Sequence, residues 1–215
     1  MIASPIDRRL LYETSAVLAI MLMPVILWPQ TKTLTALFVL AYLLTERRLR
    51  QRSWAEIGFK FKSFKQDLKA NWILVILVGI VLQLLVLGMA ARFWPAFLTH
   101  VQDRVSGVIG AQVPIMFGVL IFSTLLEELI YRALFQERFS RVFNPYVVIV
   151  VISVLFAMMH WGEGALPLVL ADVGLIVVSS SLYGLIFLRG GNVLVAWLAH
   201  LLADVVGLIG LLWLI

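Results

Sequence analysis

Two adjacent glutamates lie near the middle of a long apolar run. Glu127 and Glu128 fall close to the centre of residues 113–135, and Arg132 follows Glu128 by four residues. Carboxylates are unfavourable in hydrocarbon, so an acidic pair inside a predicted membrane span indicates a functional site. Glu128 and Arg132 share a helix face in the order that favours an ion pair, whereas Glu127 lies about 100° around the helix. One glutamate is thus predicted to be structural and the other to be free for proton transfer.

Two further apolar runs each carry a histidine. His160 follows Phe156 by four residues, which places the phenyl ring beside the imidazole, and His200 shares a helix face with Asp204. Imidazole suits proton transfer near neutral pH, and a carboxyl group in apolar surroundings suits a general base there. Glu127, His160 and His200 together could hold one water and activate it for attack on a carbonyl group. A second pair of donors would then stabilise the oxyanion.

Each of these features alone also fits a role other than catalysis. A single buried histidine is more often a satisfied core residue than a catalyst, and the Glu128–Arg132 pair alone fits a structural ion pair or a transporter's proton relay. Their common depth favours a functional centre. At about 1.5 Å per residue, Glu127, His160 and Asp204 lie roughly 18, 22 and 17 Å from the inner ends of their predicted spans, within a hydrocarbon core about 30 Å thick.

The composition places these residues in a membrane protein. Of the 215 residues 62% are hydrophobic and 13% are charged, against about 25% charged in soluble domains, and the mean hydropathy is +1.03. We expect one integral membrane domain over 1–215. The net charge of +5 does not indicate nucleic acid, because the basic residues cluster between apolar runs. The absence of cysteine excludes disulfides, thiolate metal ligands and a cysteine nucleophile.

The apolar runs predict an all-α, polytopic transmembrane bundle of about seven helices, within a range of six to eight. The predicted spans are 10–28, 33–45, 72–91, 113–139, 145–161, 171–188 and 193–214. The first is interpreted as an uncleaved helix, not a signal peptide. The stretch 161–171 fits a re-entrant loop. His100 is assigned no role, Glu163 and Asp172 are expected to be solvated, and several small residues are expected at close helix contacts (Gly79, Gly88, Gly118, Gly184, Ser179–Ser181).

One polar stretch, the linker 46–71, separates the second and third spans. It interleaves aromatic side chains with eight basic ones: Arg47, Arg48, Arg50, Arg52, Lys60, Lys62, Lys65 and Lys69. It fits either an interfacial segment on anionic headgroups or a solvated loop that only sets topology. With the N-terminus inside, 13 of the 17 Lys and Arg residues fall in inner segments and three in outer ones. This bias predicts a cytoplasmic N-terminus and linker and an outer C-terminus.

Several hydrolase motifs are missing from the sequence. It has no H-E-x-x-H, no G-x-S-x-G and no G-x-G-D, which argues against zincin-type, rhomboid-like and presenilin-like sites. Glu127, His160 and His200 are numerous enough to hold zinc, but their spacing follows no standard zinc pattern. The sequence therefore establishes no cofactor, and zinc stays an open alternative.

Three motifs of this chain resemble those of the CAAX protease and bacteriocin-processing (CPBP or Abi) intramembrane proteases, which include the type II CAAX prenyl endopeptidase. E-E-x-x-x-R stands at 127–132, F-x-x-x-H at 156–160 and H-x-x-x-D at 200–204. The resemblance covers about 113–214, the expected catalytic core. It implies a peptidase in which Glu127 and His160 activate water, His200 and Asp204 bind the oxyanion or fix the site, and Glu128, Arg132 and Phe156 support them.

The resemblance leaves mechanism and role open. The family is labelled metalloprotease, and a metal-free glutamate mechanism is also proposed for it. The family pattern also allows asparagine where Asp204 stands, and only a protonated aspartate could donate as asparagine does. Asp204 therefore either stays protonated or only orients His200.

The expected function is cleavage of a membrane-associated or lipid-anchored peptide or protein, in a prokaryotic plasma membrane and with no nucleic-acid partner. A non-catalytic binding or immunity protein of the same fold is the alternative, followed by a proton-coupled transporter, for which no inverted repeat is visible.

Overall fold

The computed structural model describes residues 5–110 and 112–214, and every regular element in this part of the chain is helical. The α-helices are α1 (Pro5–Leu27), α2 (Lys32–Leu49), α3 (Phe64–Ile76), α4 (Leu82–Phe93), α5 (Pro95–Ile109), α6 (Val113–Glu128), α7 (Glu137–Phe139), α8 (Pro145–Met158), α9 (Leu166–Gly190) and α10 (Val193–Leu214). Two π-helical stretches, η4 (Leu77–Val81) and η5 (Leu129–Gln136), join α3 to α4 and α6 to α7. The described chain thus forms eight continuous helical segments, and the predicted all-α bundle is confirmed.

Most of these segments are apolar enough to lie in a bilayer. Five are also long enough to cross it: Arg9–Leu27, Phe61–Phe93, Val113–Phe139, Leu166–Gly190 and Val193–Leu214. α8 is apolar but has only 14 residues. The chain is therefore an integral, multi-pass membrane protein.

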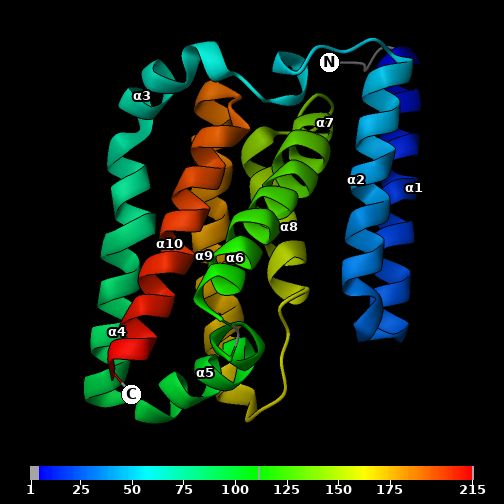
Figure 1. The fold of residues 1–215 in the computed structure, drawn as a ribbon. Coiled ribbons are helices and arrows are strands. Elements are labelled where there is room, and N and C mark those ends of the chain that lie inside the picture. The colour runs from blue at the N-terminus through cyan, green and yellow to red at the C-terminus, as the bar shows by residue number, and fades with distance from the viewer. Residues whose placement is uncertain (1–4, 111, 215) are drawn as a thin grey trace.

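The segments alternate in direction along the bundle (Figure 1). α1 and α2 form a hairpin, α3–α4 and α6–α7 run in opposite directions, and α8, α9 and α10 continue the alternation, while α5 lies across one end. We call that end the α5 end (residues 94–110, 112 and 159–165) and the opposite one the linker end (residues 50–63, 140–144 and 191–192). The linker and the turns after α7 and α9 therefore share one end of the molecule.

Several boundaries differ from those predicted. Residues 92–112 were assigned to no span and the polar cluster at 100–104 was interpreted as a loop, but residues 95–109 form α5, which buries Phe97 and His100 and exposes its other face. The stretch 161–171, which fitted a re-entrant loop, contains the start of α9 at Leu166, where Pro167 fits the first helical turn. The linker is shorter than 46–71, because α2 continues to Leu49 and α3 begins at Phe64.

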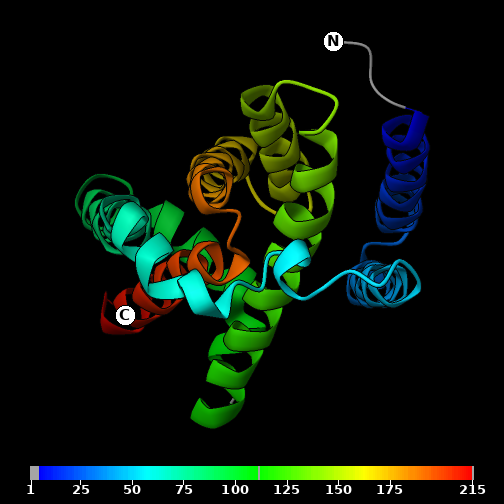
Figure 2. The ribbon, with the colours of Figure 1, turned by 90° about the horizontal axis from the view of Figure 1, so that it is seen from above.

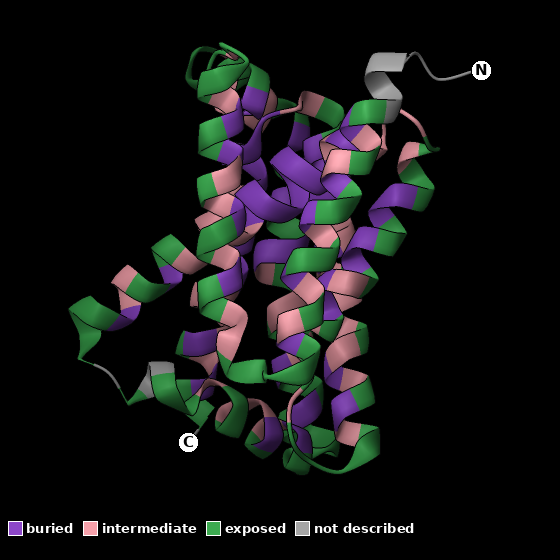
Figure 3. Cartoon of the chain, turned by 90° about the vertical axis from the view of Figure 1, so that its right-hand side faces the viewer, coloured by how far each residue is buried: buried purple, intermediate pink, exposed green. Residues whose placement is uncertain are grey.

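The core is centred on η5. All eight of its residues are buried, including Arg132 and Gln136, and the buried side chains gather toward the linker half of the bundle (Figure 3). Gln136 donates a hydrogen bond to the Gly184 carbonyl of α9, with 2.9 Å between nitrogen and oxygen. The helix that carries the glutamates is therefore held on every side at its π-helical part.

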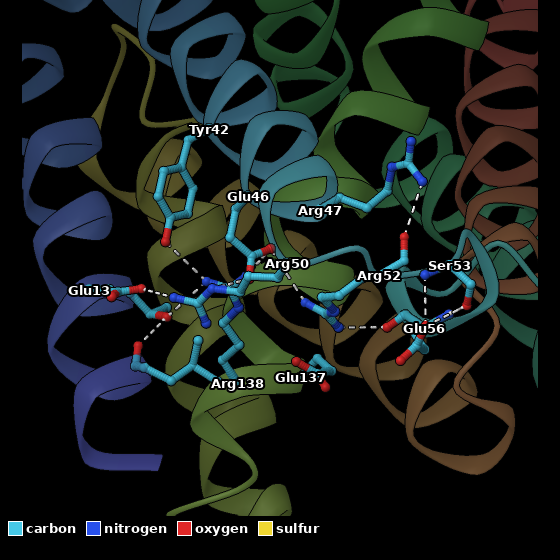
Figure 4. Close-up of polar contacts among 12 residues, drawn as sticks. Glu13, Tyr42, Glu46, Arg47, Arg50, Arg52, Ser53, Glu56, Glu137 and Arg138 are labelled. Atoms are coloured by element: carbon cyan, nitrogen blue, oxygen red, sulfur yellow. Dashed lines mark hydrogen bonds and ion pairs between the residues drawn. The ribbon is translucent and has the colours of Figure 1, made fainter. Parts of the chain in front are cut away.

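The α1–α2 hairpin stands beside the rest of the bundle (Figure 2). An ion network attaches it to α7 (Figure 4). The buried Arg138 guanidinium lies 2.8 Å from the Glu46 carboxylate of α2 and within 3.3 Å of the Tyr42 hydroxyl. Arg50 and Arg52 also pair with Glu46, at 3.2 and 3.5 Å. Glu46 thus pairs with the fully buried Arg138, whereas Arg50 is partly exposed and also pairs with Glu13 of α1. A buried charge is tolerated when it is paired in this way.

The linker folds back onto the turn between α9 and α10. Gly58 has a φ of +92°, which glycine adopts without strain, and its carbonyl accepts a hydrogen bond of 2.9 Å from the Val193 amide. Asn192 donates to the Lys60 carbonyl at 3.0 Å and to Asp67 at 2.8 Å.

A second contact lies within the linker, outside the membrane spans. The amide and hydroxyl of Ser53 donate to the Glu56 carboxylate and lower the pKa of that carboxyl.

Candidate active site

Glu127 and Glu128 stand where the helix changes from α to π. α6 ends at Glu128 and η5 begins at Leu129, and π-helical turns are frequent at functional sites. The predicted ion pair is present: Arg132 Nε lies 3.2 Å from Glu128 Oε2, and both side chains have no exposed surface. Arg132 also donates to the carbonyl and hydroxyl of Ser180 on α9, at 3.0 and 2.7 Å. These contacts fix Glu128 rigidly.

His200 is held by Glu128 and by an aromatic ring. Its Nδ1 lies 2.9 Å from Glu128 Oε1, so Nδ1–H donates to a carboxylate that also binds Arg132. The Tyr183 ring of α9 stacks on the imidazole, with centroids 4.7 Å apart and planes at 18°. The ring orientation therefore leaves Nε2 of His200 facing away from Glu128.

His160 lies in the turn that follows α8. Its Nδ1 is 2.8 Å from the Phe156 carbonyl, and because a carbonyl only accepts, Nδ1 carries the proton. The Phe156 ring lies against the imidazole, with centroids 4.6 Å apart, as predicted from the spacing of four residues. In the neutral ring, Nε2 of His160 is then an acceptor.

Both Nε2 atoms face Glu127. Glu127 Oε1 is 3.8 Å from His160 Nε2, and Oε2 is 3.8 Å from His200 Nε2. These separations exceed a direct hydrogen bond and suit bridging by water. Asp204 Oδ2 is also 3.8 Å from His200 Nε2, so the structure brings together the four residues predicted to be catalytic.

The four residues line one cavity. Its volume is about 300 Å³, and its other walls come from α4, α5, α6 and α9. The Glu127 side chain is 22% exposed, whereas Glu128 has no exposed surface. The predicted division between a free and a structural glutamate therefore agrees with the burial of the two side chains.

The distances between Glu127 and the two imidazoles differ from those of zinc ligands. At its usual bond lengths zinc holds neighbouring nitrogen and oxygen ligands about 3.3 Å apart, whereas Glu127 lies 3.8 Å from each imidazole. Among the described residues no group of three or more His, Cys, Asp or Glu side chains is arranged to hold a metal ion. Glu127, His160 and His200 as placed do not fit the ion, so no step below uses a metal.

Several contributing residues were not predicted from the sequence. Tyr183 lies among apolar residues of α9, where no spacing distinguishes it from a packing residue. Ser180 was expected only at a close helix contact, and its hydrogen bonds to Arg132 were not predicted. Asp172 was expected to be solvated and His100 was given no role, yet both are buried. Asp172 binds Arg104 at 2.7 Å and lies 3.5 Å from His100 Nε2. The hint available in the sequence was the cluster of polar residues at 100–104, which we interpreted as a loop.

Comparison with known families agrees with the motifs. Residues 109–206 match a family model described as type II CAAX prenyl endopeptidase Rce1-like. The matched segment contains Glu127, Glu128, His160, His200 and Asp204, and the resemblance predicted from the three motifs is confirmed. No curated protein and no solved structure gave a significant match. The match implies a protease that acts on membrane-associated substrates.

Proposed function

Because residues 109–206 belong to the Rce1-like family of type II CAAX prenyl endopeptidases, we propose that the protein is an intramembrane endopeptidase in which Glu127 is the general base. The observation that carries the proposal is the position of the Glu127 carboxylate, 3.8 Å from the Nε2 atoms of His160 and His200, in the wall of a cavity. A water between Glu127 and His160 is positioned by an acceptor on each side.

The reaction proceeds through these atoms in two proton transfers. Glu127 takes a proton from water as the oxygen attacks the peptide carbonyl carbon. An imidazolium at His200, whose Nδ1–H is held by Glu128, presents Nε2–H to the oxyanion. When the C–N bond breaks, the proton on Glu127 passes to the leaving amine, and the carboxylate is restored.

Asp204 is assigned to the oxyanion side of the cavity. Glu128 already binds Nδ1 of His200 at 2.9 Å, so Asp204 is not needed to orient that ring. We assign it the protonated form, which donates to the oxyanion from a position 3.8 Å from His200 Nε2.

The catalytic segment is proposed to be 113–214, with α4 and α5 completing the cavity wall. We further propose that the protein resides in a prokaryotic plasma membrane, with the linker on the cytoplasmic side. Its substrate is a membrane-associated or lipid-anchored peptide or protein.

The test is the cleavage of a panel of quenched fluorescent peptides by purified protein in nanodiscs. The panel includes apolar peptides and one with a farnesylated cysteine tail. Glu127→Gln is expected to lower the cleavage rate of any responsive peptide by about 100-fold or more, because general-base catalysis contributes that much. Glu163→Gln, a carboxylate outside the cavity wall, is the matched control and is expected to cleave at the wild-type rate. A Glu127→Gln protein with wild-type activity would remove the proposed role.

A further inference from the structure

The cavity extends from the catalytic residues toward one end of the bundle only. Beyond Glu127 and His200 its wall is built from α5 (Leu98, Val101, Arg104) and from the last turns of α10 (Leu211). α5 lies across the α5 end (Figure 1), and no residue of 50–63 contributes to the wall of this cavity. The cavity therefore leads to the α5 end.

The opposite direction is closed by packing. Between the glutamates and the linker end lies η5, in which Leu134 and Phe135 are fully buried. The linker itself is fastened over the α9–α10 turn by the hydrogen bond from the Val193 amide to the Gly58 carbonyl. A peptide approaching from the linker end would have to displace this core.

The charges of the two ends differ strongly. The stretch 46–71 carries eight Lys and Arg residues, four of them in the linker between α2 and α3 and four in the adjoining ends of these two helices. All of it lies at or next to the linker end. The basic residues toward the α5 end are Lys32, Arg92 and Arg104. Arg104 is neutralised by Asp172, at a distance of 2.7 Å. Basic segments are retained on the cytoplasmic side of membrane proteins, so the α5 end faces away from the cytoplasm.

We infer that the substrate reaches Glu127 from the non-cytoplasmic face of the membrane, passing α5. This inference rests on the proposed peptidase function, and it limits the class of proteins that could be cleaved. The cleaved bond belongs to an exported peptide or to the non-cytoplasmic segment of a membrane protein, and not to a cytoplasmic C-terminal tail. The cavity wall, largely Leu, Val, Ile and Phe, favours apolar residues beside that bond.

An ion-paired helix lies across this route. α5 is tied to α9 by Arg104, whose Nε is 2.7 Å and whose terminal nitrogen is 3.2 Å from Asp172, and His100 lies on the same carboxylate at 3.5 Å. Because Asp172 is buried and both partners sit on α5, loss of its charge releases that helix. Entry of a peptide past α5 is therefore limited by this contact.

The absence of cysteine allows a direct test. Single cysteines are introduced in the cavity wall (Ser123→Cys, Ser179→Cys), on the exposed face of α5 (Ser106→Cys) and on the exposed linker (Lys62→Cys). A membrane-impermeant maleimide is added to sealed vesicles of each orientation, and labelling is read by mass shift. We expect both cavity cysteines to react from the side that labels Ser106→Cys, and Asp172→Asn to raise their labelling rate several-fold.

Each other result overturns the inference. Labelling of the cavity cysteines from the side of Lys62→Cys would place the entrance at the cytoplasmic face. Labelling only by a membrane-permeant maleimide would indicate entry from the lipid. Labelling only after denaturation would show that the cavity is closed on both sides. The same variants carrying Glu127→Gln are expected to label identically, so the result does not depend on catalysis, and failure of the proposed protease activity is measured separately.

Discussion

At the scale of single residues, the two adjacent glutamates have different environments that predict different consequences of mutation. Glu128 is fully buried between Arg132 and His200, whereas Glu127 contacts the cavity and lies 3.8 Å from its neighbours. A side chain that neutralises a buried arginine matters for stability, and one that faces a cavity matters for chemistry. The pair therefore offers a built-in comparison between neighbouring positions.

Glu128→Gln is expected to destabilise the protein by about 3–5 kcal/mol, because it leaves the Arg132 charge buried and unpaired. Glu127→Gln is expected to change stability by no more than about 1 kcal/mol. Thermal unfolding of the two purified variants in the same detergent measures both values. Equal losses of stability would contradict the assignment of Glu128 as the structural partner.

Asp204 tests how the oxyanion is bound. Asp204→Asn places an N–H donor where we assign a protonated carboxyl group, so its cleavage rate is expected to stay within about tenfold of wild type. Asp204→Leu, which removes the donor, is expected to lose about 100-fold or more. The measurement is the rate of peptide cleavage at saturating substrate. If Asp204→Asn were as inactive as Asp204→Leu, an ionised aspartate would be the required form.

At the scale of elements, close helix contacts are only partly predictable from small residues. Of the four glycines expected at such contacts, Gly79 faces Leu202 of α10, and Gly184 faces Gln136 and Ile149. Gly88 and Gly118 have open space where a Cβ would lie, and the expectation was wrong for them. The sequence marks positions where helices can approach closely, but the rotation of each helix decides whether they do.

Gly184→Ala is expected to cost about 1–3 kcal/mol of stability, because its Cβ would lie 3.0 Å from Gln136 Oε1 and from an Ile149 methyl group. Gly118→Ala meets no neighbour within 4 Å and is expected to be neutral or slightly stabilising, since alanine favours a helix. Thermal unfolding of the two variants side by side gives the difference. A loss in Gly118→Ala as large as that in Gly184→Ala would show that the packing around η5 is not the cause.

At the scale of the whole molecule, the sequence predicted the bundle and the meeting of the four polar side chains, because intramembrane Glu, His and Asp residues are too unfavourable to leave facing lipid. It did not predict α5. The signal for a span is continuous hydrophobicity, and a helix lying across the end of a bundle alternates buried Phe97 and His100 with exposed polar residues. It also missed Tyr183, because an aromatic residue in an apolar helix is indistinguishable from core.

Whether α8 crosses the membrane determines the orientation of the helices that follow it. α8 has 14 residues, about 21 Å at the usual rise per residue, which is short for a core of about 30 Å. α9 has 25 residues, or about 37 Å, so it crosses fully.

Reporter insertions after residues 63, 142 and 191 are expected to give fluorescence of a cytoplasmic reporter, and those after 110, 164 and 215 to give activity of an exported phosphatase. The insertion after 164 is the critical one, because α9 can return to the linker end only if the short α8 and the turn carrying His160 have reached the far side. Phosphatase activity there, with fluorescence after 142, would confirm the crossing; fluorescence at both would mean that α8 does not cross, and the orientation of α9 and α10 would have to be reversed.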